Sequence, residues 1–324
     1  MAEFRIMTWN VQNLLGVGHD SGPDSAAQLA AKIASLAAVV DAAQPHVLAV
    51  QEVGTEPVMR QFQDALTWKL PHLALGKPDA RGIRVGFCSK RVIRDPIDVM
   101  PFPPGLLPVQ TGDDPQGSAG PPTMDGMGRG ALQITVTANT RDLRLVTCHL
   151  KSKLLSYPGG RFFPRSEDER ARFGAYALNR RSSEATTVRQ WMNATIDDEG
   201  VNEPFVLLGD MNDEVDAATT QILNGPSGSE IGTRGFDIPD AGDRQRLFNL
   251  APLIDPERRV TRRYRGRGEF IDHIFVSRFL AGNTTEVTTV QAGGGPLPSI
   301  ADDPQAADDH LGSDHAAVLA TFDF

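Results

Sequence analysis

The sequence predicts an α/β or α+β protein in which sheets are layered against helices. Short apolar, β-prone segments alternate with two longer stretches of helical periodicity, and several strand patterns follow one another directly. The chain has 324 residues, of which 40% are hydrophobic and 23% are charged, as is ordinary for a folded protein with a large core. This composition excludes wholesale disorder, a collagen-like repeat and a disulfide scaffold.

The first half of the chain contains three predicted strands and one predicted helix. The strands are residues 4–9, 46–50 and 83–88, which are short, apolar and β-prone. Over residues 25–43, apolar side chains recur at steps of three and four and predict a helix, which Pro45 ends. Residues 101–128 are dense in Pro and Gly without a hydrophobic period, so they predict a long loop.

The second half contains five predicted strands and one long predicted helix. The strands are residues 131–137, 144–149, 205–208, 270–276 and 316–322. Ser166 and Glu169 have the spacing of a capping box, which predicts the start of a helix that continues to Ile196. A second loop, rich in Gly, Pro and Asp, is predicted over residues 291–311.

Charge, cysteine content and hydropathy limit the partners and the location. The net charge of −9 argues against a general polyanion binder, although it leaves room for a local basic patch. The two cysteines, Cys88 and Cys148, fit a reducing compartment and are expected to be unpaired. No apolar run approaches the ~18 residues that span a membrane, and the N-terminus lacks an apolar run of signal-peptide length. We therefore expect a soluble, cytoplasmic protein without a membrane partner.

The polar residues that could carry chemistry share one position, at or beside the ends of predicted strands. They are Asn10, Glu52, His149, Asp210, Asn212, Asp272, Asp314 and His315. A single Asp at such a position is usually a turn former or a helix cap. Several such residues can instead converge at one edge of a sheet, which makes them candidates for a common site.

Carboxylates combined with an amide suit hard cations, namely Mg²⁺, Mn²⁺ or Ca²⁺. The sequence has no CxxC or HExxH motif for zinc, no phosphate-binding P-loop motif and no GxSxG motif. A hard cation beside two histidines favours phosphate-ester chemistry, because the metal and a cationic imidazole both stabilise charge on the phosphoryl oxygens.

The motifs that contain these residues carry a family resemblance. In chain order they are Thr8-Trp9-Asn10-Val11-Gln12-Asn13, Gln51-Glu52, His149-Leu150-Lys151-Ser152, Gly209-Asp210-Met211-Asn212-Asp213, Ile271-Asp272-His273-Ile274 and Gly312-Ser313-Asp314-His315. The set resembles that of the endonuclease/exonuclease/phosphatase superfamily, which contains deoxyribonuclease I and the abasic-site endonucleases. The resemblance implies a single domain over residues 1–324 with a four-layer fold, two packed and mostly antiparallel β-sheets flanked by helices, and a site at one sheet edge.

The resemblance also implies a metal site for Mg²⁺ or Mn²⁺, with Ca²⁺ as a third candidate. Glu52 would be the main ligand, and Asn10 and Asp314 would lie near the same ion. Among the catalytic residues, Asp210 would orient or deprotonate the attacking water and Asn212 would contact the scissile phosphate.

Two histidines complete the implied catalytic set. His315 would contact the phosphate or act as a general acid or base, with Asp272 holding its other ring nitrogen. His149 would be the second histidine over the phosphate, but the carboxylate that orients its counterpart in deoxyribonuclease I has no identifiable equivalent between residues 81 and 129. Asn13 and Arg129 would contact the substrate, and Arg129 is expected just before a strand.

Local charge favours a polyanionic substrate, and together with the family resemblance it predicts a nuclease that acts on DNA, although the residues themselves leave the choice between DNA and RNA open. Basic residues gather over 151–189 and 258–267, and Lys151, Arg263 and Arg265 from these clusters are predicted substrate contacts. The adjacent Phe162 and Phe163 could stack on bases or anchor their loop in the core. A phosphomonoesterase, a lipid-headgroup phosphodiesterase and a non-catalytic nucleic-acid-binding module stay open as alternatives, as does the oligomeric state.

Overall fold

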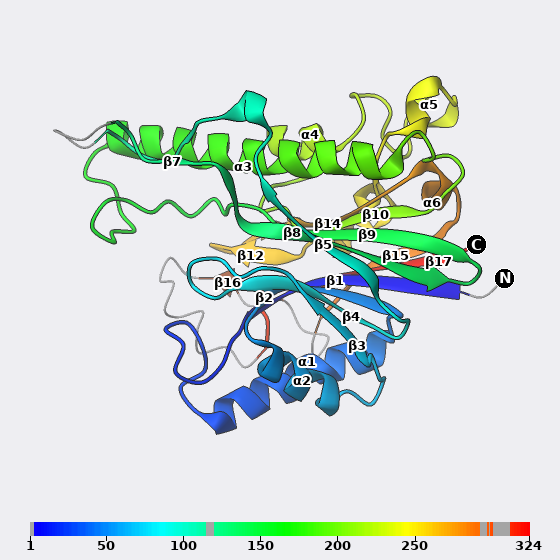
Figure 1. The fold of residues 1–324 in the computed structure, drawn as a ribbon, viewed down its shortest axis with the longest axis horizontal. Coiled ribbons are helices and arrows are strands. Elements are labelled where there is room, and N and C mark those ends of the chain that lie inside the picture. The colour runs from blue at the N-terminus through cyan, green and yellow to red at the C-terminus, as the bar shows by residue number, and fades with distance from the viewer. Residues whose placement is uncertain (1–2, 115–119, 292–296, 298, 301–311) are drawn as a thin grey trace.

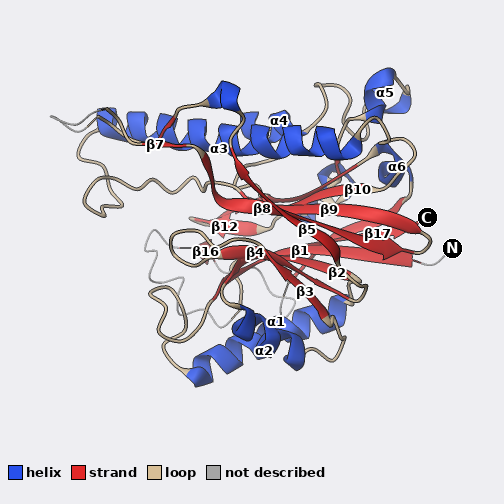
Figure 2. Ribbon diagram, viewed as in Figure 1, coloured by secondary structure: helices blue, strands red, loops and turns tan. Residues whose placement is uncertain are grey.

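Two six-stranded sheets pack face to face, and helices cover the outer face of each sheet (Figures 1 and 2). The structure is a computed structural model of the chain, and it describes residues 3–114, 120–291, 297, 299–300 and 312–324. The order of the layers, helix–sheet–sheet–helix, confirms the predicted fold class. Both sheets are mostly antiparallel, also as predicted.

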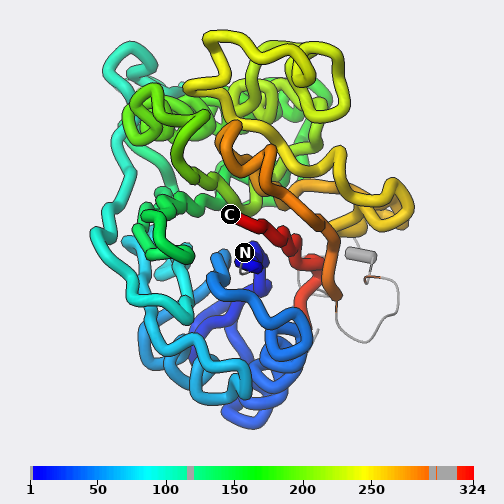
Figure 3. Tube along the Cα trace, turned by 90° about the vertical axis from the view of Figure 1, so that its right-hand side faces the viewer, coloured from blue at the N-terminus to red at the C-terminus, as the bar shows by residue number. Residues whose placement is uncertain are grey.

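The first sheet contains the first and the last strand of the chain. Its strands, in spatial order, are β15 (Thr284–Val290), β17 (Ala317–Asp323), β1 (Glu3–Leu14), β2 (Val47–Val53), β4 (Arg84–Ser89) and β3 (His72–Leu75). The only parallel pair among these strands is β1–β2. Figure 3 shows the N-terminal strand beside the C-terminal strand, which pair with Glu3 opposite Asp323.

The second sheet repeats this plan. Its strands, in spatial order, are β11 (Phe248–Asn249), β14 (Asp272–Val276), β10 (Phe205–Asp210), β9 (Arg141–His149), β8 (Gly126–Ala138) and β5 (Arg94–Pro101). Here the only parallel pair is β9–β10. Each sheet therefore has one parallel pair at its centre, so two neighbouring strands end at the same edge.

The helices lie on the outer faces of the sheets. Helices α1 (Ala26–Ala43) and α2 (Glu56–Ala65) cover the first sheet, and α3 (Glu167–Ile196) and α4 (Ala218–Leu223) cover the second (Figure 1). Short helical segments fill the connections: α5 (Arg234–Asp237), α6 (Arg278–Gly282), η1 (Pro104–Leu106), η2 (Ala241–Arg244), η3 (Ala251–Leu253) and η4 (Pro256–Arg258). Helix α1 is long and apolar enough to cross a membrane, but its apolar face packs against the first sheet.

The two long helices begin where the sequence predicts. The Ser25 side chain accepts a hydrogen bond from Gln28 N at the start of α1, and the Ser166 side chain accepts one from Glu169 N at the start of α3. The second interaction of the predicted capping box, in which the Glu169 side chain would accept a hydrogen bond from the Ser166 backbone N–H, is wrong. The Glu169 carboxylate accepts hydrogen bonds from Arg161 and from the backbone N–H of Arg165.

The predicted loop at 101–128 contains more structure than expected. It holds η1, the pair β6 (Val109–Gln110) and β7 (Thr123–Met124), and the first residues of β8, while residues 115–119 lie outside the described part. The predicted loop at 291–311 lies almost entirely outside the described residues. A smaller sheet is formed by β13 (Arg267–Glu269), β12 (Arg262–Tyr264) and β16 (Ser299–Ile300).

An apolar core between the two sheets fixes their relative position. Phe4, Ile6 and Phe87 from the first sheet pack with Ile134 and Leu145 from the second. Close packing of this kind leaves little freedom for one sheet to slide over the other. Residues at the ends of β1, β2, β9 and β10 are thereby held together. Both cysteines are buried and unpaired, as predicted.

Candidate active site

The ends of the two parallel pairs meet across the gap between the sheets. Asn10 Nδ2, from β1, donates a 3.0 Å hydrogen bond to Asp210 Oδ2, from β10. The same Asp210 oxygen lies 3.3 Å from His149 Nε2, and this nitrogen lies 3.9 Å from Glu52 Oε1. The four residues, which are predicted to share a sheet edge, therefore form one continuous chain of contacts from Asn10 through Asp210 and His149 to Glu52.

The backbone at these strand ends adopts left-handed conformations. Asn13, Glu52 and Asn212 have φ values of 52°, 61° and 53°. The conformations of Asn13 and Glu52 coincide with an irregularity in the pairing of β1 with β2, which begins after Asn10. Such conformations are disfavoured for residues with a Cβ atom and concentrate at functional sites. Here they redirect side chains that regular strands would place on alternating faces.

Two features fix the position of the Asp210 carboxylate. Gly209, just before it, has φ of 144°, and a Cβ atom there would lie 2.0 Å from the carbonyl oxygen of Cys148, so glycine permits the close approach of β9 and β10. Asn212 N donates a 2.8 Å hydrogen bond to Asp210 Oδ1, and Asn212 Nδ2 donates one to Leu150 O. The turn after β10 thus locks both the carboxylate and the Asn212 amide.

His315 forms a buried pair with Asp272. The Nδ1 atom of His315 lies 2.7 Å from Asp272 Oδ2. Thr261, which the sequence does not single out, supports both partners: its hydroxyl accepts hydrogen bonds from Ile271 N and Asp272 N, and its carbonyl accepts one from Ala316 N. The histidine–carboxylate pairing expected from the sequence is present in the structure.

Asp314 joins the site through its backbone. Its N–H donates a 2.9 Å hydrogen bond to Gln12 Oε1, and Ser313 Oγ donates one of 2.6 Å to Asn10 O. Both acceptors belong to β1. The segment before β17 is therefore attached to the strand end that carries Asn10, which brings Asp314 to the same side of the molecule as Asp210.

Burial and neighbouring charge shift the pKa values of Asp210 and His315 upward. Burial and the nearby Asp272 carboxylate raise the pKa of Asp210 to about 6. For His315, burial favours the neutral ring, but the carboxylates of Asp272 and Asp314 outweigh it and raise the pKa to about 10. At neutral pH the site therefore contains an ionised carboxylate of increased basicity and a cationic imidazole.

His149 has the opposite surroundings. Burial, together with the positive charges of Arg129 and His315, lowers its pKa well below the ordinary value, even though Asp210 is close. Its Nδ1 atom is buried and has no hydrogen-bond partner in the described part of the chain. No carboxylate among the described residues bonds to this nitrogen, in keeping with the lack of an identifiable equivalent in the sequence.

Arg129 lies within β8, so the expectation that it precedes a strand is wrong, because β8 begins at Gly126. Its Nε atom is 3.9 Å from Asp79 Oδ2, and one of its terminal nitrogens is buried with no hydrogen-bond partner in the part of the chain that the structure describes. Asp79 also accepts a hydrogen bond from Arg81 N. Asp79 therefore contacts both Arg129 and the backbone of Arg81.

Lys151 is positioned by a buried carboxylate that sequence analysis missed. Glu184, from α3, accepts hydrogen bonds from Lys151 N and Gly128 N and pairs with Arg180. Burial and the charge of Arg180 lower the pKa of Lys151 to about 8, and its Nζ atom donates to Ser152 O. Glu184 thus connects the strands that carry Arg129 and His149, yet in the sequence it is one of many charged residues of a helix.

The predicted contacts Arg263 and Arg265 lie on the hairpin formed by β12 and β13. This hairpin adjoins the site, because Arg262 forms a β-bridge with His315. Arg265 occupies the turn with φ of 47°, and its guanidinium lies 5.7 Å from the centre of the Tyr264 ring. The hairpin that carries both arginines therefore lies next to His315, outside the cluster around Asp210.

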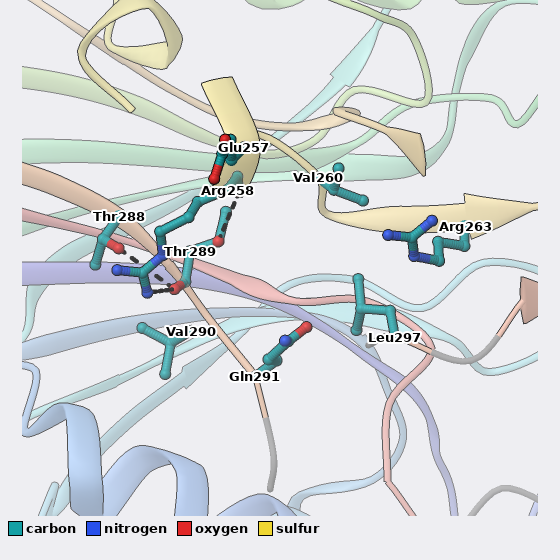
Figure 4. A pocket seen from close by; sticks show the side chains of 9 residues that line it. All are labelled: Glu257, Arg258, Val260, Arg263, Thr288, Thr289, Val290, Gln291 and Leu297. Atoms are coloured by element: carbon teal, nitrogen blue, oxygen red, sulfur yellow. Dashed lines mark hydrogen bonds between the residues drawn. The ribbon is translucent and has the colours of Figure 1, made fainter. Parts of the chain in front are cut away.

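Arg263 lines a pocket of about 420 Å³ next to the hairpin (Figure 4). On the opposite side of this pocket, Arg258 donates a 3.1 Å hydrogen bond to Thr289 O, and the Thr289 hydroxyl donates back to Arg258 O. The residues that converge on Asp210 do not line it. The pocket is thus separate from the carboxylate–histidine cluster.

The donor atoms suit a hard cation. Asp210, Asp272 and His315 offer ligand atoms within 4.8 Å of one another, and the buried Asp272 Oδ1 has no hydrogen-bond partner among the described residues. Because His315 is protonated and bound to Asp272, its ring is a poor ligand, which leaves the carboxylate and amide oxygens. The Glu52 carboxylate, partly exposed and bonded to Asn13 N, is available beside them.

The Endonuclease/Exonuclease/phosphatase family matches residues 7–315. No curated protein sequence matches the chain. Among solved structures, truncated TDP2 of Caenorhabditis elegans aligns with a TM-score of 0.55 at 14% identity, over 99% of this chain and 97% of that chain. The human Nocturnin catalytic domain with bound sulfate aligns with a TM-score of 0.54 at 14% identity, over 99% and 94%. D. rerio TDP2 complexed with a single-strand DNA product aligns with a TM-score of 0.54 at 14% identity, over the whole of both chains.

Proposed function

Because the chain belongs to the Endonuclease/Exonuclease/phosphatase family, whose members are phosphoester hydrolases, we propose that it is a metal-dependent phosphodiesterase that cleaves nucleic acid, in particular DNA. The observation that carries this proposal is the convergence of Asp210 and His315 from different sheets, one as a basic carboxylate and the other as a cation. Because the site needs both sheets, we also propose that residues 1–324 act as a single domain.

In this proposal water attacks the phosphorus atom in line with the leaving oxygen. Asp210 orients the water and accepts its proton, which requires the ionised carboxylate present above about pH 6. The His315 cation stabilises negative charge on the phosphoryl oxygens, and Asp272 keeps it protonated and oriented. His149 and Asn212 contact the phosphate as neutral hydrogen-bonding groups.

The metal proposed for this site is Mg²⁺ or Mn²⁺, with Ca²⁺ as a third candidate. Glu52, Asn10 and Asp314 would hold it, since all three offer oxygen atoms at the same edge as Asp210. When bound, a divalent ion neutralises phosphoryl oxygens and polarises the ester.

Positive side chains around the site support a polyanionic substrate. Arg129 and Lys151 flank His149 closely enough to lower its pKa. Arg263 and Arg265 extend from the neighbouring hairpin, and Asn13 lies beside Glu52. We propose that these five residues contact the backbone of the bound strand. The single-strand DNA product held by D. rerio TDP2 supports DNA as the substrate class.

The proposal is tested by incubating purified protein with supercoiled plasmid and with a single-stranded oligonucleotide, in Mg²⁺, in Mn²⁺ and in EDTA. We expect cleavage that EDTA abolishes, that His315→Ala abolishes, and that His72→Ala on β3 leaves unchanged. Release of inorganic phosphate from a phosphomonoester or a lipid headgroup without strand cleavage would contradict the proposal. Tight DNA binding without cleavage in any divalent ion would also contradict it and favour a binding module.

A further inference from the structure

The loop between β9 and α3, residues 150–166, exposes two adjacent aromatic rings. The exposed fractions of Phe162 and Phe163 are 56% and 69%. The sequence left open whether this pair anchors the loop in the core, and the exposure excludes that role. Two neighbouring phenyl rings in water forgo the free energy of burial, so their position suggests a surface that is covered by a partner.

The loop holds these rings in a defined position. Arg161 pairs with Glu169 at 2.7 Å and donates a 2.9 Å hydrogen bond to the carbonyl oxygen of Phe163. Tyr157 N bonds to Arg161 O, and the Tyr157 ring packs against Phe173 of α3 with ring centres 5.0 Å apart. A surface fixed in this way loses little conformational entropy when it binds a partner.

The loop begins directly after the proposed catalytic residue His149. Its first residues are tied to the site, because Lys153 Nζ lies 3.3 Å from Asp213 Oδ1 and Arg181 donates to Lys151 O. In Figure 1 the loop runs outward from the end of β9, on the side of the molecule where β12 lies, and then turns into α3. A strand that leaves the site on this side would pass the loop.

Charge next to the rings matches a phosphate backbone. Arg165 is exposed, and its side chain has no ion pair or hydrogen bond with another described residue. Of the nearby carboxylates, Glu167 pairs with Arg170 at 2.6 Å and Glu169 pairs with Arg161 at 2.7 Å. An aromatic pair beside an exposed guanidinium is a combination that binds single-stranded nucleic acid, in which unpaired bases stack and phosphates contact cations.

We propose that Phe162 and Phe163 stack on unpaired bases of a single-stranded segment whose scissile phosphate lies at Asp210. Arg165 contacts the phosphate backbone that links the stacked bases. This inference rests on the proposed function. It implies that the protein prefers substrates with a single-stranded stretch long enough to reach from the catalytic cluster to the loop.

The test measures kcat/KM on single-stranded DNA of two lengths, a dinucleotide and a 15-nucleotide strand. For Phe162→Ala/Phe163→Ala we expect about a tenfold or larger loss on the long strand, through KM, because a base–aromatic stack contributes about that factor. The loss should be absent on the dinucleotide, and Phe162→Tyr/Phe163→Tyr should restore the long-strand value. Ile238→Ala, another exposed apolar residue, is the matched control.

Three results would overturn the inference. One is an unchanged KM on the long strand, and another is an equal loss on both lengths, which would indicate a structural effect. The third is co-sedimentation with phosphatidylcholine–phosphatidylserine vesicles that the double variant abolishes, which would assign the rings to a membrane surface. If the unaltered protein cleaved neither strand but hydrolysed a phosphomonoester, the proposed function would fail first.

Discussion

His315 and His149 are proposed to face the same phosphate, but they lie in opposite surroundings. His315 has the Asp272 carboxylate 2.7 Å from Nδ1 and the Asp314 charge nearby, and these carboxylates raise its pKa despite its burial. His149 is equally buried, has no partner for Nδ1 among the described residues, and lies near Arg129. Because both rings are buried, the comparison shows that neighbouring charge decides which imidazole is cationic at neutral pH.

In the proposed mechanism the two histidines therefore have different roles. A cation stabilises charge that develops in the transition state, whereas a neutral ring contributes an ordinary hydrogen bond. The arrangement also avoids placing two adjacent cations in one buried site. Asp210 lies next to both histidines. Its negative charge helps to raise the pKa of His315, and its Oδ2 atom lies 3.3 Å from His149 Nε2.

The largest effect is expected for Asp210→Asn, because Asp210 lies beside both His315 and His149. We expect kcat to fall about 10³-fold, because the proposed base is lost. The variant should also be more stable than the unaltered protein at pH 8, by about 1–3 kcal/mol, since the raised pKa reports a cost of ionising Asp210 in the fold. That cost is complete above pH 6 and vanishes below the unfolded pKa near 4, so the gain should disappear at pH 3.5.

Kinetics and urea denaturation at the two pH values measure these effects. Asp64→Asn, at an exposed site on α2, is the matched control and should change neither quantity. A variant that keeps full activity, or loses activity together with stability at pH 8, would contradict the role given to Asp210.

A smaller effect is expected for Asp272→Asn, which removes the carboxylate that distinguishes His315 from His149. We expect kcat to fall about 10²-fold. Without Asp272 the pKa of His315 must fall, so the decline of activity on the alkaline side should move down from about pH 10 toward neutrality. A pH–rate profile from pH 5 to 10.5 measures the shift, and an unmoved alkaline limb would show that His315 does not act as a cation.

The smallest of the three effects is expected for His149→Asn. Because His149 is neutral, its replacement removes one neutral hydrogen bond, and we expect kcat/KM to fall about tenfold. The pH–rate profile should keep its shape. His315→Asn, measured in parallel, should cost at least ten times more. Equal losses of kcat/KM in the two variants would indicate that the two histidines carry the same charge and would contradict the difference proposed between them.

The strand ends that form the site could be predicted because their chemistry departs from their surroundings. A buried apolar strand that ends in Asp210 or Glu52 must place a carboxylate at a sheet edge, and ordered motifs then identify the edge. The long helices could be predicted from their periodicity and their serine caps. The edge strands β3 and β5 could not, because β5 is exposed along most of its length and contains prolines and charges typical of a loop.

The residues that support the site could not be predicted from the sequence either. Thr261 and Glu184 act through backbone hydrogen bonds to residues that come from other elements, so their roles depend on the tertiary arrangement. The positive surroundings of His149 arise from Arg129 and Lys151, whose convergence needs the pairing of β8 with β9. No local pattern distinguishes these charges from solvated ones.

The central claim is that the two histidines hold opposite charge states at neutral pH. It is tested most directly by a pH titration of the imidazole NMR signals in ¹⁵N-histidine-labelled protein, with His315→Ala and His149→Ala used to assign the two rings. The account predicts that His315 stays protonated from pH 6 to 9 while His149 stays neutral over the same range. Titration of both rings near pH 6.5, the value of an unperturbed histidine, would contradict it.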